Sequence, residues 1–485
     1  MNPTIESAAA AAKPHVPVED IRAAFEAQRL NRWRIAQTTA KERAAKLRRL
    51  KEAILSRKEE LHEALRCDFQ KNPGEADLTE IFPVISEINH TIAHLPRWMR
   101  PVRVKTPLAL FGARSEVRLE AKGLVLILSP WNYPFHLLIN PLVAALAAGN
   151  CVILKPSSKV PRTSQFIRRF IADLFPSDEV AVFEGSAAVS DALLELPFDH
   201  IFFTGSPRIG RTIMAAASKH LTTLTLELGG KSPVIIDETA DIRKAAERTV
   251  WGKFLNAGQT CVAPDYLLIH ESRLEDFLSQ AKKIVAERFG GTEDARRASP
   301  DFCRLVSLGH QQGLSRVLEE SLRHGAKVEI GGIGKADERY LAPTLLSNIR
   351  EDSPIMKEEI FGPILPIIAY KNLEEVFRII RSKEKPLALY VFSQSEENIE
   401  RVLRNTTAGG TCVNTMIVHL ANPDLPFGGV GASGMGNYHG YHGFRALSHE
   451  RAVLRQGWID TLRFFYPPYT AWVRRLIRLA TKYLT

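Results

Sequence analysis

Short apolar runs alternate with helical patterns between Gly123 and Asp237, and this alternation constrains the fold more than any other feature. The runs are Leu124–Leu128, Val152–Leu154, Val180–Phe183, Ile201–Phe203, Leu224–Leu228 and Val234–Ile236. Strands that are apolar throughout are typical of parallel sheets, because helices cover both faces of such a sheet. The segment is therefore predicted to form a doubly wound α/β sheet, a common platform for a dinucleotide.

A second alternation, from Ala246 to Thr415, predicts another α/β domain. Its strand candidates are Tyr266–His270, Ile364–Tyr370, Leu387–Phe392 and Thr411–Asn414. A chain of 485 residues is too long for one ordinary core, so two or three domains are expected.

The two ends of the chain differ from these α/β segments. Residues 1–17 are rich in alanine and proline and are predicted to be a mobile arm. The pattern from Val18 to Lys71 is helical, with Leu47, Leu50, Ile54, Leu61 and Leu65 on one face. Residues 458–485 are predicted to form a basic amphipathic tail, with an apolar face made by Trp472, Leu476, Leu479 and Tyr483. Such a helix lies on an anionic membrane surface or packs on the protein itself.

Charge and cysteine content exclude several classes of protein. The net charge of +10 would attract anions, but the basic residues are spread through helices, and no aromatic-basic module for a nucleic acid is visible. The 5 cysteines are widely separated, and no two of them form a Cys-x-x-Cys pair, so neither a disulfide framework nor a zinc site is predicted. The first residues lack the basic start of a secretory signal, so we expect a cytoplasmic protein.

Two segments near the middle of the chain carry a carboxylate and a thiol. Glu227 precedes a Gly-Gly-Lys sequence, and Cys261 ends the segment Phe254–Cys261. A thiol can attack an electrophilic carbon, and a carboxylate can activate the water that releases the product. Each residue alone has an ordinary explanation, because a lone cysteine is usually a small buried hydrophobe. Together they indicate acyl chemistry through a thioester.

Further motifs occur in one fixed order along the chain. They are Ser129–Phe135, Phe203–Gly210, Glu358–Pro363 and Pro426–Gly429. With these motifs the chain resembles an aldehyde dehydrogenase from about Val18 to about Gln456. Gly431–Gly436 and Tyr438–Gly440 resemble the class-three branch. Phe254–Tyr266 and Pro197–His200 are most similar to bacterial coniferyl-aldehyde dehydrogenases, and fatty-aldehyde dehydrogenases come next.

The resemblance implies the aldehyde dehydrogenase fold. Its cofactor domain would comprise residues 18–102 and 121–229, and its catalytic domain residues 230–415. Residues 103–120 and 416–457 would form a small oligomerisation arm and a return segment, which implies a homodimer. From the residues alone, Arg103–Glu120 and Ser448–Gln456 are compatible with surface hairpins as well.

The same resemblance gives roles to three catalytic residues. Cys261 would be the nucleophile, Glu227 would activate water, and no metal would be required. Asn132 lies in a turn between Pro130 and Pro134, where its amide can donate to an oxyanion together with the backbone N–H of Cys261. The commoner use of an asparagine is to satisfy its own turn.

The cofactor implied by the resemblance is NAD or NADP. Gly205 permits close backbone approach, and Ser206 begins a helix whose N-terminus suits a phosphate, although such a serine is usually only a cap. Ser158 stands where many NAD-preferring relatives have a glutamate, which makes NADP tolerable. The residues assigned to the cofactor are Trp131, Lys155, Ser158, Gly205, Ser206, Gly210, Glu359 and Phe361.

The substrate is expected to be an aromatic or long apolar aldehyde, oxidised to the carboxylic acid. Tyr133, Trp251, Phe254 and the segment Thr415–Leu425 are predicted to line its pocket. Coniferyl aldehyde is suggested by the nearest resemblance, and fatty aldehydes are the alternative. A catalytically silent structural or binding protein on the same fold is an alternative of another class, but it need not retain Asn132, Glu227 and Cys261 together.

Overall fold

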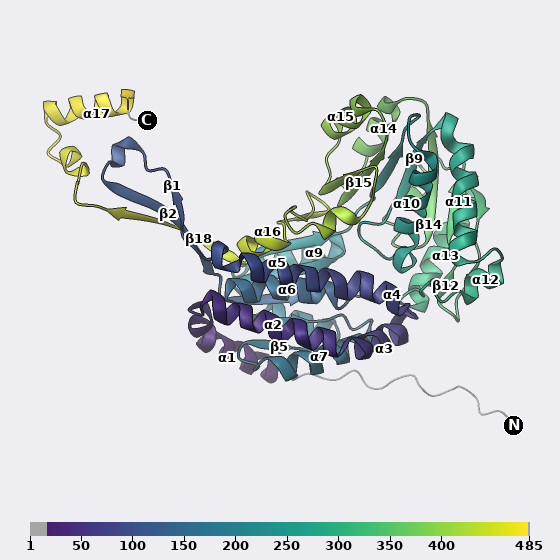
Figure 1. Cartoon of the computed structure of the whole chain (residues 1–485), viewed down its shortest axis with the longest axis horizontal. Helices are drawn as coiled ribbons and strands as arrows, with labels where there is room; N and C mark the ends of the chain where they lie inside the picture. The colour runs from purple at the N-terminus through teal and green to yellow at the C-terminus, as the bar shows by residue number, and fades with distance from the viewer. Residues whose placement is uncertain (1–16, 484–485) are drawn as a thin grey trace.

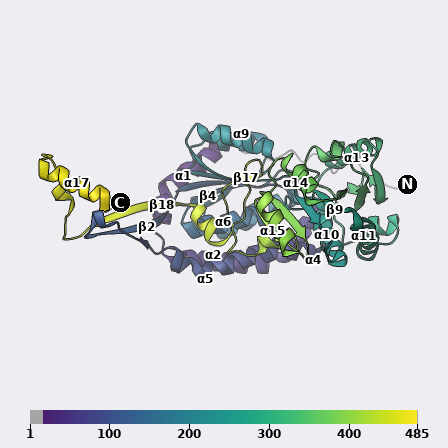
Figure 2. The ribbon, with the colours of Figure 1, turned by 90° about the horizontal axis from the view of Figure 1, so that it is seen from above.

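The computed structural model describes residues 17–483, so the arm predicted for residues 1–17 lies outside the described residues except for Pro17. The described chain forms two α/β units and a narrow three-stranded sheet that projects from one of them (Figure 1). The C-terminal helix lies at the far end of this projection, as the view turned by 90° also shows (Figure 2).

The first unit is built on a six-stranded sheet. Its strands are β3 (Leu124–Leu128), β4 (Cys151–Lys155), β5 (Val180–Val182), β6 (His200–Gly205), β7 (Thr223–Leu228) and β17 (Gly434–Met435). The order is β17-β7-β6-β3-β4-β5, and every neighbouring pair is parallel except β17 with β7. The short strand β17 therefore returns from the C-terminal part of the chain to the edge beside β7.

Helices cover both faces of this sheet, which confirms the predicted doubly wound fold. One face packs against α1 (Val18–Ala36), α8 (Ala187–Leu194) and α9 (Pro207–Ser218), and the other against α2 (Ala40–Ser56), α5 (Phe82–Trp98), α6 (His136–Ala148) and α7 (Pro161–Leu174). Val125 and Ile127 of β3 belong to one core, and Leu124 and Leu126 to the other. The helical pattern of residues 18–71 forms α1, α2 and α3 (Lys58–Phe69), and its predicted apolar face is buried.

The second unit contains a seven-stranded sheet. Its strands are β8 (Pro233–Ile236), β9 (Tyr266–His270), β10 (Lys327–Ile330), β13 (Thr344–Ser347), β14 (Ile364–Tyr370), β15 (Ala388–Phe392) and β16 (Gly410–Val413). The order is β10-β13-β14-β9-β8-β15-β16, with only β10 antiparallel to its neighbour. Its helices are α10 (Ile242–Phe254), α11 (Leu274–Phe289), α12 (Glu293–Ala298), α13 (Leu308–Arg323), α14 (Leu373–Arg381) and α15 (Glu396–Asn405). The strands β11 (Gly334–Lys335) and β12 (Tyr340–Leu341) form a separate ribbon.

One strand assignment from the sequence requires correction. Val234–Ile236, the last run of the first alternation, does not extend the first sheet but lies in β8, between β9 and β15. The chain crosses between the two units at Gly229–Ser232, directly after β7. An apolar run indicates a buried strand but not the sheet to which it belongs, because both parallel sheets bury their strands on both faces.

The projecting sheet consists of β1 (Val102–Val104), β2 (Ala113–Ala121) and β18 (Ser448–Gln456). Strand β18 pairs antiparallel with β2 along its whole length, from Ser448 opposite Ala121 to Gln456 opposite Ala113. The segments that the sequence left open as surface hairpins thus form one sheet. The short helix α16 (Gly440–Ala446) leads into β18 and packs against α5 and α6.

The C-terminal tail forms α17 (Ala471–Tyr483). It contacts the 3-10 turn Leu462–Phe465 at the end of the projecting sheet, and of its residues only Val473 is buried. In Figure 1 this helix lies at the far end of the projecting sheet, away from the two α/β units. No helix among residues 17–483 is long and apolar enough to cross a membrane.

Candidate functional site

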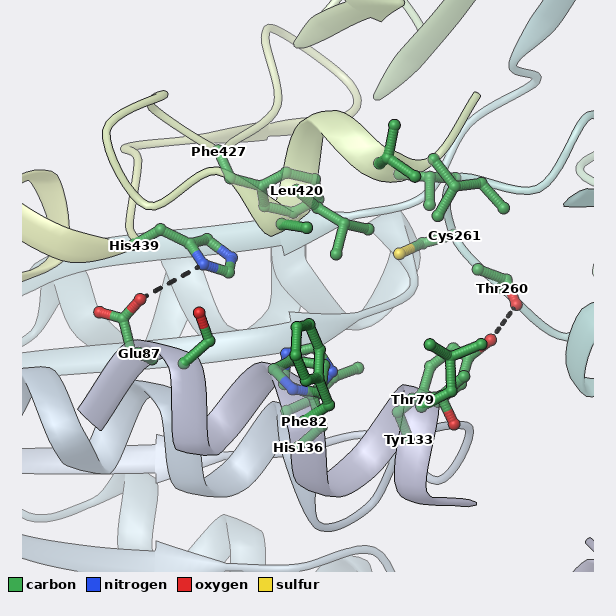
Figure 3. A pocket seen from close by; sticks show the side chains of 18 of the residues that line it. Thr79, Phe82, Glu87, Tyr133, His136, Thr260, Cys261, Leu420, Phe427 and His439 are labelled. Atoms are coloured by element: carbon green, nitrogen blue, oxygen red, sulfur yellow. Dashed lines mark hydrogen bonds and ion pairs between the residues drawn. The ribbon is translucent and has the colours of Figure 1, made fainter. Parts of the chain in front are cut away.

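The thiol of Cys261 is held by a sharply bent segment after α10. Asn256 and Ala257 have φ values of 53° and Gly258 has a φ of 74°, so three successive residues adopt left-handed backbone. A side chain at Gly258 would also collide with the carbonyl oxygen of Gly362. Only glycine combines this conformation with this close approach without strain. The bend places Cys261 in the wall of a cavity (Figure 3).

The carboxylate of Glu227 lies near the C-terminal end of β7. Its side chain is buried, and neither carboxylate oxygen has a hydrogen-bond partner in the described chain. Burial raises the pKa of Glu227 well above its usual value. Burial also raises the pKa of Tyr438, and the charges of Glu227 and Cys261 raise it further, so these three residues are electrostatic neighbours. A buried carboxylate without a partner is suited to take a proton from a bound molecule.

Asn132 is held beside the bend that carries Cys261. Its Nδ2 donates to the backbone carbonyl oxygen of Gln259 at 3.1 Å, and the backbone carbonyl oxygen of Asn132 accepts from Asn256 Nδ2 at 2.9 Å. The amide nitrogen has two hydrogens, so one remains for a ligand. Next to it, the hydroxyl groups of Tyr133 and Thr260 are 2.6 Å apart. The structure therefore brings Asn132 to the segment that ends in Cys261.

A buried ion pair supports the turn that contains Asn132. Lys71 Nζ and Glu80 Oε1 are 3.1 Å apart, and both side chains are fully buried. Glu80 Oε2 accepts from the backbone N–H of Phe135 at 3.2 Å and of His136 at 2.9 Å. Lys71 Nζ lies 4.7 Å from the ring centroid of Tyr133. Sequence reasoning missed this pair, because charged residues in an amphipathic helical segment are usually solvated.

Glu75 supports the bend that leads to Cys261. Its Oε1 accepts from the backbone N–H of Asn256 at 3.0 Å, at the first left-handed residue of the bend. Burial raises the pKa of Glu75, while the charge of Lys71 lowers it. The segment before α5 thus contacts both loops of the candidate site, which are the turn that contains Asn132 and the bend that leads to Cys261. The contacts are made by Lys71, Glu75 and Glu80.

Burial, together with the charges of Glu359 and Glu227, raises the pKa of the Cys261 thiol to about 12. The thiol therefore keeps its proton at neutral pH. Burial and the neighbouring Asp265 likewise raise the pKa of Glu359 to about 8. A positive charge bound beside Cys261 would favour its thiolate form.

Two of the residues predicted to bind the cofactor line a cleft of about 1180 Å³. Ser206 and Glu359 both lie there, with Gly229 between β7 and β8. The carboxylate of Glu359 lies directly against Gly229, where a side chain would collide with it. The cleft also contains Arg208 and Arg211, which sequence reasoning did not assign. The charge of Glu359 raises the pKa of Cys261, so the thiol in the wall of the first cavity lies near this residue of the cleft.

The remaining predicted cofactor residues do not line this cleft. Gly205 ends β6, and Ser206 caps α9 by accepting from the N–H of Ile209 at 3.5 Å. Gly210 follows in the first turns of α9, where an added side chain would be 2.9 Å from Leu228. Lys155 ends β4, and the structure shows no partner for its ammonium group within residues 17–483. Ser158 is exposed in the following turn.

The rings of Trp131 and Phe361 meet at 5.3 Å in an edge-to-face contact. Phe361 has a φ of 49°, and its carbonyl oxygen is 2.9 Å from His310 Nε2. The described residues fit a dinucleotide. The N-terminus of α9 follows Gly205, Lys155 ends β4 without a partner in the described chain, and the cleft with Ser206 lies at the carboxyl ends of strands.

The first cavity has a volume of about 240 Å³ and is mostly apolar. Tyr133 and Trp251 line it as predicted, and so do Ile417, Val418, Leu420, Ala421 and Pro423 from the predicted segment. Phe254 does not line it, because this ring is buried and packs edge-to-face on Phe289 at 6.1 Å. Sequence reasoning missed the walls formed by the starts of α5 and α6 and by part of the return segment. These walls include Phe82, Glu87, His136, Phe427 and His439 (Figure 3).

Comparison with known proteins supports a family assignment. The sequence model described as "Aldehyde dehydrogenase family" matches residues 1–453. The chain is 44% identical to a 4,4'-diaponeurosporen-aldehyde dehydrogenase of Staphylococcus aureus over 88% of this chain and 92% of the relative. It is 38% identical to a probable coniferyl aldehyde dehydrogenase of Pseudomonas aeruginosa, over 95% and 96%. It is 42% identical to human aldehyde dehydrogenase family 3 member B1, over 90% and 92%.

Solved structures show the same fold. A substrate-bound Staphylococcus aureus AldH aligns with a TM-score of 0.90 and 41% identity, covering 95% of this chain and 99% of that chain. An Escherichia coli NADP-dependent enzyme aligns with a TM-score of 0.84 and 27% identity, covering 91% of each chain. A Mycobacterium tuberculosis aldehyde dehydrogenase complexed with NAD+ aligns with a TM-score of 0.83 and 26% identity, covering 92% of each chain.

Proposed function

Since the chain belongs to the aldehyde dehydrogenase family, we propose that it oxidises an aromatic or long apolar aldehyde to the carboxylic acid with NAD or NADP. The observation that carries the proposal is a thiol, Cys261, in the wall of a mostly apolar cavity, with the unpartnered carboxylate of Glu227 as an electrostatic neighbour. Relatives in complex with NAD+ and dependent on NADP support the choice of cofactor.

The proposed reaction uses three side chains. Cys261 Sγ attacks the aldehyde carbon as the thiolate, and Asn132 Nδ2 with the backbone N–H of Cys261 holds the oxyanion. When bound, the oxidised nicotinamide supplies the hydride acceptor and a positive charge that favours the thiolate. Loss of the hydride leaves a thioester on Cys261. Glu227 then takes a proton from water, which attacks the thioester and releases the acid and the free thiol.

The cofactor would occupy the cleft that contains Ser206 and Glu359. In this proposal the N-terminus of α9 holds the pyrophosphate, with Gly205 and Gly210 permitting the approach. Lys155 and Ser158 face the adenosine ribose, Glu359 holds the nicotinamide ribose, and Trp131 and Phe361 pack beside the ring. The unpartnered ammonium group of Lys155 at the end of β4 supports this placement.

A panel of purified aldehydes with NAD and NADP tests the substrate assignment. Preference for coniferyl-type aldehydes would support the first choice, and preference for medium- or long-chain alkanals would support the fatty-aldehyde alternative. Reduced nicotinamide, measured at its absorbance band, reports turnover. If no aldehyde produced reduced cofactor, the proposed function would be wrong and a silent binding protein would remain.

Replacement of Ser158 tests the ribose end of the site. We expect Ser158→Glu to raise the Michaelis constant for NADP by about tenfold or more and to leave that for NAD nearly unchanged, because a carboxylate repels a 2′-phosphate. Ser158→Gln, which has the same shape without the charge, is the matched control. Equal effects on both cofactors would show that Ser158 does not face the 2′ position.

We propose that the projecting sheet joins two copies of this chain in a homodimer. Strand β18 pairs with β2 on one side, and its other edge has no strand beside it within residues 17–483. Such a long free edge readily pairs with a second chain. Sedimentation equilibrium of the purified protein measures this directly, and a monomer would contradict the proposal.

The C-terminal helix is proposed to associate weakly with anionic membrane surfaces. Trp472, Leu479 and Tyr483 are exposed on α17, beside Arg474, Arg475, Arg478 and Lys482. Each basic residue near an anionic surface contributes about 1 kcal/mol. We expect the protein to co-sediment with anionic vesicles at low salt but not with neutral ones, and deletion after Pro468 to abolish the binding. Equal recovery of full-length and truncated protein in the pellet would exclude a tail-driven association.

A further inference from the structure

One polar group in the wall of the substrate cavity has no partner. His136, at the start of α6, is only 7% exposed and lines the cavity with Cys261 (Figure 3). Its Nε2 atom is buried without a hydrogen-bond partner in the described chain, and no other residue that lines the cavity has such an atom. Burying an acceptor with no donor is unfavourable, so such an atom indicates a ligand or a water molecule.

The ring of His136 is neutral at physiological pH. The backbone carbonyl of Thr79 interacts with the ring and acts to raise its pKa. Burial, with the charges of His439 and Lys71, lowers the pKa of His136 to about 3. At neutral pH the ring therefore carries a single proton. Placed on Nδ1, where the Thr79 carbonyl favours it, this proton leaves Nε2 with a free lone pair. Only a hydrogen-bond donor can satisfy it.

The surroundings of His136 restrict the donor further. Phe82, Leu420 and Phe427 are apolar, so the donor must belong to a largely apolar molecule. Glu87 also lines the cavity, where its Oε1 accepts from the N–H of Gly440 at 2.8 Å and its Oε2 lies 3.7 Å from His439 Nδ1. A carboxylate there would repel an anionic substrate. In the view of Figure 3, His136 lies between Cys261 and the Glu87–His439 pair.

We propose that His136 Nε2 accepts a hydrogen bond from a hydroxyl group of the substrate, so that the enzyme selects hydroxyaryl aldehydes over unsubstituted ones. The aldehyde carbon would lie at Cys261, the ring in the apolar part of the cavity, and the hydroxyl at His136. This inference rests on the proposed function, because it requires that the cavity bind the aldehyde. His136 is thus a specificity residue that touches the substrate away from the reacting atoms.

Two pairs of aldehydes test the proposal, since they place the hydroxyl at two distances from the aldehyde. They are 4-hydroxybenzaldehyde with benzaldehyde, and 4-hydroxycinnamaldehyde with cinnamaldehyde. For each pair, the ratio of kcat/KM values is measured for wild type, His136→Leu and His136→Gln. Intrinsic reactivity of the aldehydes affects all three enzymes equally, so it cancels when the ratios are compared.

We expect His136→Leu to lower the hydroxyl preference by about tenfold or more in at least one pair, because a site that binds a hydroxyl discriminates against analogues that lack it. In His136→Gln the amide oxygen reaches the former Nε2 position, so this variant should keep most of the preference. Both variants remove the imidazole ring and its interaction with the Thr79 carbonyl, which makes them a matched pair. Activity with the unsubstituted aldehydes shows that each variant is folded.

Three results would overturn the proposal. Unchanged ratios in His136→Leu would show that a water molecule, and not the substrate, is the partner of Nε2. Equal losses of activity with both members of each pair would show that His136 is only structural. If wild type oxidised neither member of either pair nor any other aldehyde, the proposed function itself would fail, whereas activity without hydroxyl preference would contradict only the role of His136.

Discussion

Replacement of Cys261 by alanine is expected to lower turnover by at least about 1000-fold, because no other group can form the thioester. The other cysteines cannot replace it. Cys151, Cys303 and Cys412 are buried, Cys67 is exposed on α3, and none of the four lines the cavity. Steady-state formation of reduced nicotinamide measures the loss.

Binding of the cofactor to Cys261→Ala should remain near normal, because the substitution removes one sulfur atom and leaves the cleft with Ser206 and Glu359 intact. Calorimetric titration with NAD and NADP measures this binding. Cys67→Ala is the matched control and should retain full activity. A Cys261→Ala variant that kept most of its turnover would show that the mechanism is not covalent.

Replacement of Glu227 by glutamine is expected to separate the two halves of the reaction. Thioester formation does not need the carboxylate in the proposed mechanism, so rapid mixing should show a burst of reduced cofactor that approaches one equivalent per site. Hydrolysis loses its base, and the following steady rate should fall by about 100-fold or more. The burst appears only if hydride transfer remains faster than hydrolysis. A steady rate near that of wild type would show that water is activated by another group.

The pH dependence of thioester hydrolysis tests the role of Glu227 independently. Burial raises the pKa of Glu227, so the carboxylate ionises at a higher pH than an ordinary glutamate. Only the ionised form can accept a proton, and the wild-type rate of thioester hydrolysis should therefore rise with pH through this pKa. In Glu227→Gln this rise should be absent. Single-turnover measurements from acidic to alkaline pH compare the two proteins.

Much of the fold could be predicted because periodicity is a local property. The apolar runs at Leu124–Leu128 and Ile364–Tyr370 are bounded by turn residues, and each forms a strand with the predicted limits. Strands β10 and β13 were not predicted. They are short, and β10 is only partly buried at one edge of the sheet, so neither has a strong apolar pattern. Periodicity also could not assign Val234–Ile236 to its sheet.

The sequence by itself determined the doubly wound units and the motif residues Asn132, Glu227 and Cys261, because short-range patterns and fixed local spacing carry that information. Only the tertiary structure decided what surrounds those residues. The pairing of Lys71 with Glu80, the support of Asn256 by Glu75 and the unpartnered Nε2 of His136 all depend on contacts between segments far apart in the chain. A charged or polar side chain in a helical pattern looks the same in the sequence whether water or a buried partner satisfies it. Burial and partnership are set by the packing of whole elements, and no local pattern records them.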